Sequence, residues 1–174
     1  MEQMQIPEPW LRGTLQDVPP VLRAVLHALE LAQEDVNRWC RDFGREALNS
    51  RLHGLPSLAF QVRHIGRSID RLLTYAEGKE LSDAQLKLLA SESDPDATAE
   101  SLFREFDEAI RTAMDRIRPF SPAVLNEPRH VGRKRLPTTV AGLLVHVADH
   151  TQRHVGQAIT TAKLLRSMAG SEPV

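Results

Sequence analysis

The chain has 174 residues and one cysteine, Cys40. A single cysteine cannot form an intramolecular disulfide, which favours a reducing compartment. No apolar run approaches the ~20 residues that a membrane-spanning helix needs. Residues 1–15 also lack the basic and apolar regions of a signal peptide. The sequence therefore predicts a cytoplasmic protein that has no membrane partner.

An excess of charge of either sign is absent as well. The 22 basic and 23 acidic residues give a formal net charge of −1. This balance argues against polyanionic partners such as nucleic acid or anionic lipid. Basic residues cluster only at 129–137, a short run typical of a solvated loop, and no helix-turn-helix spacing is recognisable. We expect a small-molecule partner rather than a nucleic acid.

Apolar residues at helical spacing are abundant. They predict four long helices, over residues 17–43, 56–78, 96–120 and 138–168. Four amphipathic helices in one chain indicate an all-α fold, a four-helix bundle. The stretch 78–97 is a long crossover connection that carries a short extra helix of its own, over residues 81–93.

The local signals set the expected boundaries. Asp17 is a plausible N-cap for the first helix, with Pro19 and Pro20 in its first turn, and Gly44 can end it. Ser57, Ser82 or Asp83, and Thr138 or Thr139 stand at the starts of later helices. Trp10 is expected to pin an extended N-terminal arm.

These boundaries predict three regions. Residues 1–17 form the arm, residues 18–168 form one bundle domain, and residues 169–174 form a C-terminal tail. Prolines and glycines between residues 120 and 137 predict an irregular connection, in which 129–137 can form a short extended ribbon.

Three histidines recur every fourth residue in HVADHTQRHVGQ, residues 146–157. In a helix, positions i and i+4 share a face with Cβ atoms about 6 Å apart, so two such imidazoles can bind one metal ion. Positions i and i+8 are about 12 Å apart along the axis. One ion can therefore take His146 with His150, or His150 with His154, plus a ligand from another helix.

His64 is the candidate third ligand, because it lies beside the apolar stripe of the second helix, on a line with Gln61, Ser68 and Arg71. A half-buried histidine is, however, often a hydrogen-bonded packing residue. The spacing alone also does not place two helices side by side. From the residues by themselves, a metal site and a polar stripe on a helix both remain open.

Three segments resemble one known family. LLVHVADHTQRHVGQ is similar to the closing-helix motif of the DinB/YfiT-like family, LPSLAFQVRHIGRSIDRLL to its second-helix motif, and RKRLPTTVAGLLVHV to the segment that enters the last helix. The resemblance spans about residues 18–166 and is weak over 79–120. It implies a four-helix bundle, often a homodimer, with a metal ion held by His64, His150 and His154.

The sequence departs from the family pattern near the last ligand. Arg153 replaces a frequent histidine, Val155 a frequent arginine, and Asp149 a common asparagine. These changes leave the three ligands in place and alter the residues expected at the entrance of the site. Asp149 is expected to face solvent or to pair with Arg153.

The catalytic residues are not assigned by the sequence beyond two possible helpers. Gln157 can orient a ligand histidine or a bound water, and His146 can act as an acid or base because imidazole titrates near neutrality. Gly156 would allow a neighbouring backbone to approach. The remaining histidines and the cysteine are expected to be polar surface or packing residues: His27, His53, His130 and Cys40.

Two functions of different classes are consistent with these features. The first is a metal-dependent enzyme in which Zn²⁺ or Ni²⁺ lowers the pKa of a bound water or thiol. By resemblance it is a transferase or isomerase that uses a low-molecular-weight thiol, and a hydrolase is the other option. No carboxylate is placed like the glutamate of H-E-x-x-H, which disfavours peptide hydrolysis. The second is a non-catalytic, dimeric bundle with a structural or sensing metal.

Overall fold

A computed structural model describes residues 6–170, so the expectations for residues 1–5 of the arm and 171–174 of the tail fall outside the described part of the chain. The four expected long helices are present. They are α1 (Pro20–Trp39), α3 (Leu58–Ala76), α5 (Ala99–Ile117) and α6 (Val140–Met168). The fold is all-α, as predicted.

Shorter elements precede or connect these helices. Two are α-helices, α2 (Arg45–Asn49) and α4 (Asp83–Ala90), and three are 3-10 turns, at Pro9–Leu11, Leu52–Gly54 and Pro122–Val124. The α2 helix was not predicted, because five residues are too few to show helical periodicity. The connection before α6 is more ordered than the irregular segment expected. Its ribbon is a hairpin of antiparallel strands β1 (Pro128–Val131) and β2 (Leu136–Thr139).

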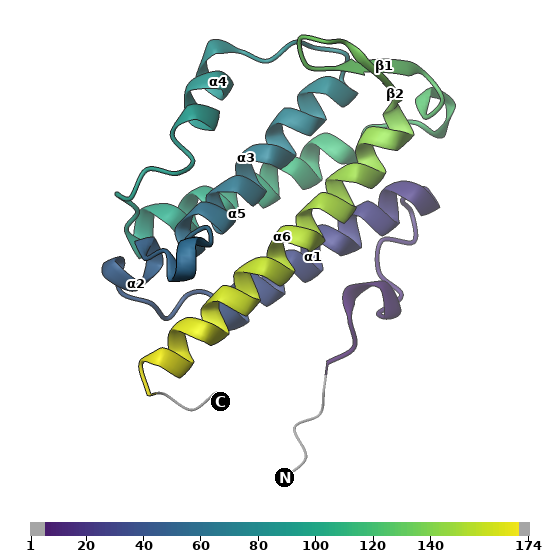
Figure 1. Ribbon diagram of the computed structural model, residues 1–174. Helices are drawn as coiled ribbons and strands as arrows, with labels where there is room; N and C mark the ends of the chain where they lie inside the picture. The colour runs from purple at the N-terminus through teal and green to yellow at the C-terminus, as the bar shows by residue number, and fades with distance from the viewer. Residues whose placement is uncertain (1–5, 171–174) are drawn as a thin grey trace.

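The four long helices lie around one core in the order α1, α6, α3, α5 (Figure 1). Each helix is in contact with its two neighbours in that order. Among the four long helices, α1, α3 and α5 supply the largest fully buried side chains. These include Leu22, Leu26, Ile65, Ile69 and Phe106. Within residues 6–170, no helix is long and apolar enough to cross a membrane.

The crossover between α3 and α5 returns along the whole length of α3. Figure 1 shows that α3 and α5 run in the same direction. The intervening chain must therefore travel back before α5 begins. Its side chains mark the path, because Gln85 bonds to Thr74, Glu92 to Arg71, and Asp96 to Arg63.

Three arginines of α3, spaced four residues apart, hold this crossover. We call Arg63, Arg67 and Arg71 the arginine clamp. Arg63 donates to the Asp94 carbonyl and the Asp96 carboxylate, each at 2.7 Å. Arg67 donates to the carbonyl of Leu88 at 2.7 Å. Since α4 has no buried residue, polar contacts rather than apolar packing fix the crossover.

Side-chain caps define most helix starts. The hydroxyl groups of Ser57, Thr98 and Thr139 accept from backbone N–H groups three residues on, and Ser82 forms a capping box with Gln85. Each such bond satisfies a donor that the first helical turn leaves free. The starts expected at Ser57, Ser82 and Thr139 are confirmed.

The expected cap and end of the first helix are wrong. α1 begins at Pro20 after Pro19, which has no side-chain cap, and Asp17 is exposed. A residue that precedes proline avoids the helical region, so Val18 and Pro19 cannot belong to the helix. α1 ends at Trp39, five residues before Gly44, and Cys40 is its C-cap.

The N-terminal segment is not pinned by Trp10, which is 62% exposed and donates only to Glu8. Two polar contacts to α1 hold the segment instead. Arg12 pairs with Glu34, and Thr14 bonds to His27 at 3.1 Å. His27, expected to be a polar position, is buried under this segment and bonded to it.

Replacing Arg63 with leucine should loosen the crossover without unfolding the bundle. The Asp94 carbonyl loses its buried donor, which should lower the free energy of unfolding by about 1–3 kcal/mol. Urea denaturation measures this loss, and hydrogen exchange should accelerate over residues 92–97. Arg104→Leu is the matched control, because that arginine pairs on the exposed surface of α5 and its loss should cost less than about 0.5 kcal/mol. Equal losses in both variants would contradict the role of the clamp.

Candidate metal centre

The packing of α3 against α6 brings three histidines together. His64 comes from α3, and His150 and His154 come from successive turns of α6. One ring nitrogen from each lies within 4.8 Å of the other two. The Nε2 atoms of His64 and His150 are 3.0 Å apart. The structure therefore unites the three residues that the sequence offered as ligands, and His146 is not among them.

Two oxygen atoms set which nitrogen is free on two of the three rings, those of His64 and His154. The carboxylate of Glu92 lies 2.8 Å from Nδ1 of His64, and the amide oxygen of Gln61 lies 3.0 Å from Nδ1 of His154. Both oxygens accept, so each Nδ1 carries the proton and each Nε2 keeps its lone pair. A hydrogen-bonded partner of this kind is what orients a metal-ligating histidine.

Glu92 was not singled out from the sequence, although it is the closest partner of His64. It is 4% exposed, and its other oxygen accepts from Arg71 at 2.6 Å. Burial raises the pKa of Glu92, but the hydrogen bonds from His64 and Arg71 outweigh it and hold the pKa below the usual value. No local signal marks Glu92, because it stands in a polar stretch and meets His64 only through the crossover.

Gln61 and Arg71 had a weak signal in the sequence. Both lie on the line of α3 that contains His64, and that line was identified as facing the bundle. Their specific partners depend on the tertiary structure: Gln61 bonds to a residue of α6 and Arg71 to a residue of the crossover. Phe60, one turn before His64, stacks on its ring at 5.4 Å between centroids.

Two of the three imidazoles, those of His150 and His154, are held neutral. Burial, followed by the nearby His154 and His64, lowers the pKa of His150 to about 4. Burial, followed by His64, lowers the pKa of His154 as well. A metal ion needs unprotonated nitrogen, so neutral rings at pH 7 are ready to bind without losing a proton.

His146 and Gln157 lie at the exposed end of the site. His146 Nδ1 is 2.7 Å from a carboxylate oxygen of Asp149, and the side chain of His146 is 45% exposed. Asp149 also pairs with Arg153, as expected. Gln157 is exposed, and its side chain acts to raise the pKa of His154, against the lowering by burial. The Nδ1 of the His154 ring is bonded to Gln61.

The other candidate residues lie apart from this cluster. His53 and His130 are exposed, and Cys40 is buried in the core. Burial raises the pKa of Cys40 to about 12, which makes it a poor nucleophile. Gly156 does not support the expected close backbone approach, since a Cβ there would meet nothing within 4 Å.

The donor set fits a divalent ion. A tetrahedral zinc ion with Zn–N bonds of ~2.0–2.1 Å places its ligand nitrogens about 3.3 Å apart. The observed separations, 3.0 Å for one pair and no more than 4.8 Å for the others, bracket that value. Three imidazoles are also the ligand type that zinc, nickel and copper ions accept.

Comparison with known proteins supports the same interpretation. A sequence profile of the DinB superfamily matches residues 28–158. The match covers well over half of the chain, includes the whole triad and ends four residues after His154. No curated protein sequence matches the chain.

The metal-free protein should lose stability as the pH falls from about 6.5 to about 4. In this window the unfolded chain protonates His150 near its ordinary pKa of 6.5, while the folded state resists protonation down to about 4. The unfolded state binds more protons, so acid favours it. Urea denaturation at several pH values measures the slope. His150→Gln should flatten it, and an equally steep slope in that variant would contradict the assignment.

Glu92→Gln should weaken metal binding while the bundle stays folded. Glutamine keeps the shape of the side chain and loses the charge that stabilises a ligated His64. Loss of such a partner typically lowers metal affinity ~10–100-fold. Zinc titration against a competing chelator measures the change. Glu105→Gln is the matched control, because Glu105 also pairs with a clamp arginine but does not contact the triad. Equal affinities in all three proteins would refute the role of Glu92.

Proposed function

The chain belongs to the DinB superfamily, and on that premise we propose that it is a metal-dependent enzyme acting on a small molecule. One divalent ion, zinc or nickel, is held by His64, His150 and His154. The observation that carries this proposal is the convergence of three imidazole nitrogens within 4.8 Å. Three protein ligands leave coordination positions open for a water or substrate, as in catalytic zinc sites.

When bound, such an ion acts as a Lewis acid and lowers the pKa of a water or thiol that binds to it. The protein contributes the orientation of the ligands. Glu92 and Gln61 fix the tautomers of His64 and His154, and Phe60 covers one face of the His64 ring. His146 and Gln157, at the exposed end of the line, are the helpers that we propose for contacts with the small molecule.

The reaction class that we favour is transfer or isomerisation with a low-molecular-weight thiol. Hydrolysis of a peptide bond by metal-activated water usually needs a free carboxylate as general base, as in H-E-x-x-H enzymes. The carboxylate next to this triad is not free, since His64 and Arg71 occupy the two oxygens of Glu92. A thiol substrate would need no such base, because an ion held by the three histidines would favour the deprotonated thiol. Hydrolysis of a more reactive small molecule is the remaining enzymatic option.

A second candidate is a non-catalytic homodimer in which the metal is structural or senses its supply. Two exposed valines favour it: Val21 at the start of α1 is 40% exposed, and Val145 near the start of α6 is 53% exposed. The starts of α1 and α6 lie at the same end of the bundle (Figure 1). A second copy of the chain that covers this end of the bundle would bury both side chains in a symmetric interface.

Elemental mass spectrometry of the untagged protein tests the metal site. After reconstitution with zinc or nickel and gel filtration, the wild type should retain about one equivalent of metal. His150→Ala should retain less than about a tenth of that amount. His130→Ala is the control, because it removes an exposed histidine of β1 and should leave the content unchanged. A wild type that retains no metal would overturn the proposal.

Turnover then separates the two candidates. Loaded wild-type protein should join a low-molecular-weight thiol to a small electrophile, and a chelator or His150→Ala should abolish the reaction. Protein that retains one equivalent of metal, shows no turnover with thiols or ester substrates, and is dimeric by native mass spectrometry would instead support the non-catalytic bundle.

A further inference from the structure

A second hollow lies between α3, α4 and α5, with a volume of about 210 Å³. None of its lining residues is a histidine, and none comes from α6. It is therefore separate from the triad, which sits where α3 meets α6. The hollow is open to solvent on one side, and concave surfaces with mostly apolar walls are where proteins bind small molecules.

Small side chains keep the hollow open. Gly66 of α3 faces Ala109 of α5, and a Cβ on Gly66 would lie 3.0 Å from the Ala109 Cβ. The two helices thus already touch at this point and cannot move closer to fill the space. Ala113, one turn further along α5, adds only a methyl group to the wall. Leu73 and Leu88 complete the apolar part of the lining.

The roof of the hollow is α4, which covers the space without packing into it. α4 has no buried residue, and Leu88 on its inner side remains 42% exposed. Polar tethers hold it in place. Gln85 donates to Asp70 at 2.7 Å, and Arg67 donates to the Leu88 carbonyl. Because hydrogen bonds rather than apolar packing hold α4, a small molecule can bind beneath it without disrupting the core.

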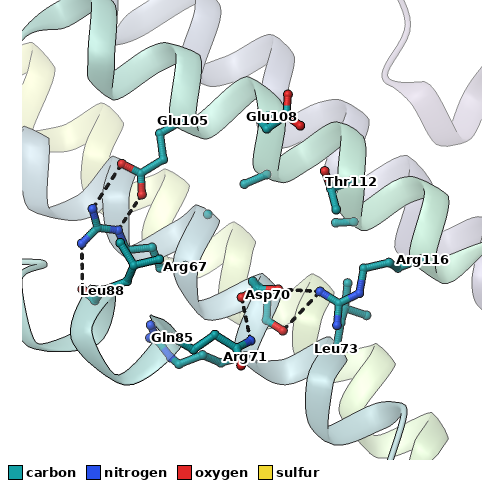
Figure 2. Close-up of a pocket in the computed structure, with 13 residues that line it drawn as sticks. Arg67, Asp70, Arg71, Leu73, Gln85, Leu88, Glu105, Glu108, Thr112 and Arg116 are labelled. Atoms are coloured by element: carbon teal, nitrogen blue, oxygen red, sulfur yellow. Dashed lines mark hydrogen bonds and ion pairs between the residues drawn. The ribbon is translucent and has the colours of Figure 1, made fainter. Parts of the chain in front are cut away.

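The charges around the hollow neutralise one another. Figure 2 shows Arg67 with Glu105 at one end and Arg116 with Asp70 at the other. The third arginine of the lining, Arg71, pairs with Glu92. Since each arginine already has a carboxylate partner, the rim does not favour an ion of either sign.

We propose that this hollow binds a neutral small molecule with an aromatic body of one or two rings and one hydrogen-bonding group. A cavity of about 150 Å³ accepts benzene, so a volume of about 210 Å³ suits a slightly larger ring system. The apolar walls take the rings. The hydroxyl group of Thr112, in the lining, offers a donor and an acceptor for the polar group.

Indole is the probe that tests this site, with binding measured by calorimetry and by chemical-shift changes in the lining residues. We expect saturable binding of indole at one site, with shifts confined to α3, α4 and α5. Indole-3-carboxylate, which is charged, should bind at least about tenfold more weakly, because it would leave an unpaired charge in the hollow. No shift in these helices at millimolar indole would overturn the proposal.

Thr112→Phe fills the hollow from its exposed edge and should weaken indole binding at least about tenfold. Asp115→Phe is the matched control, because Asp115 is exposed on the same helix and does not line the hollow. It should bind indole as the wild type does. Equal loss, or no loss, in both variants would refute the assignment. Circular dichroism and metal content, unchanged in both, separate this result from a failure of folding or of the metal centre.

Discussion

The parallel course of α3 and α5 is the constraint on which the rest of the structure depends. Because both helices run in the same direction, the chain between them has to travel the full length of the bundle before α5 begins. The leucines of α4, on this return path, stay about two-fifths exposed, so apolar burial attaches the segment only weakly. The arginine clamp supplies the missing attachment, with hydrogen bonds from α3 to carbonyl and carboxylate oxygens of the crossover.

The same attachment delivers a carboxylate to the histidine cluster. Burying Glu92 is unfavourable by itself, since a charge leaves water. Bonds from Arg71 and His64 offset that cost and use both of its oxygens. The result is a rigid arrangement in which the crossover, the clamp and the candidate metal ligand support one another. A topological requirement of the fold thus also orients His64.

The α3 helix has different chemistry on its different sides. Toward α6 it presents His64 and Gln61, and toward α5 it presents Gly66 and the apolar wall of the hollow. Arg71 stands between these sides, since it lines the hollow and also binds Glu92. The histidine triad and the hollow are therefore distinct in their residues and adjacent in space.

Local sequence determined what depends on neighbours within a few residues. The 3.6-residue period marked the four long helices, hydroxyl side chains marked the starts of α3, α4 and α6, and the i, i+4 spacing placed His150 beside His154. The apolar stripe of the second helix made His64 a candidate third ligand, and the resemblance to a family joined it to His150 and His154. Local expectations failed where other local chemistry competed. Two prolines displaced Asp17 as the cap of the first helix, and Trp10 stayed exposed instead of pinning the N-terminal segment. Only the tertiary structure decided that Glu92 and Gln61 would hold the rings of the triad. Those contacts join residues 28 and 93 positions apart, and such distances are set by helix packing and by the path of the crossover, which no short-range pattern encodes.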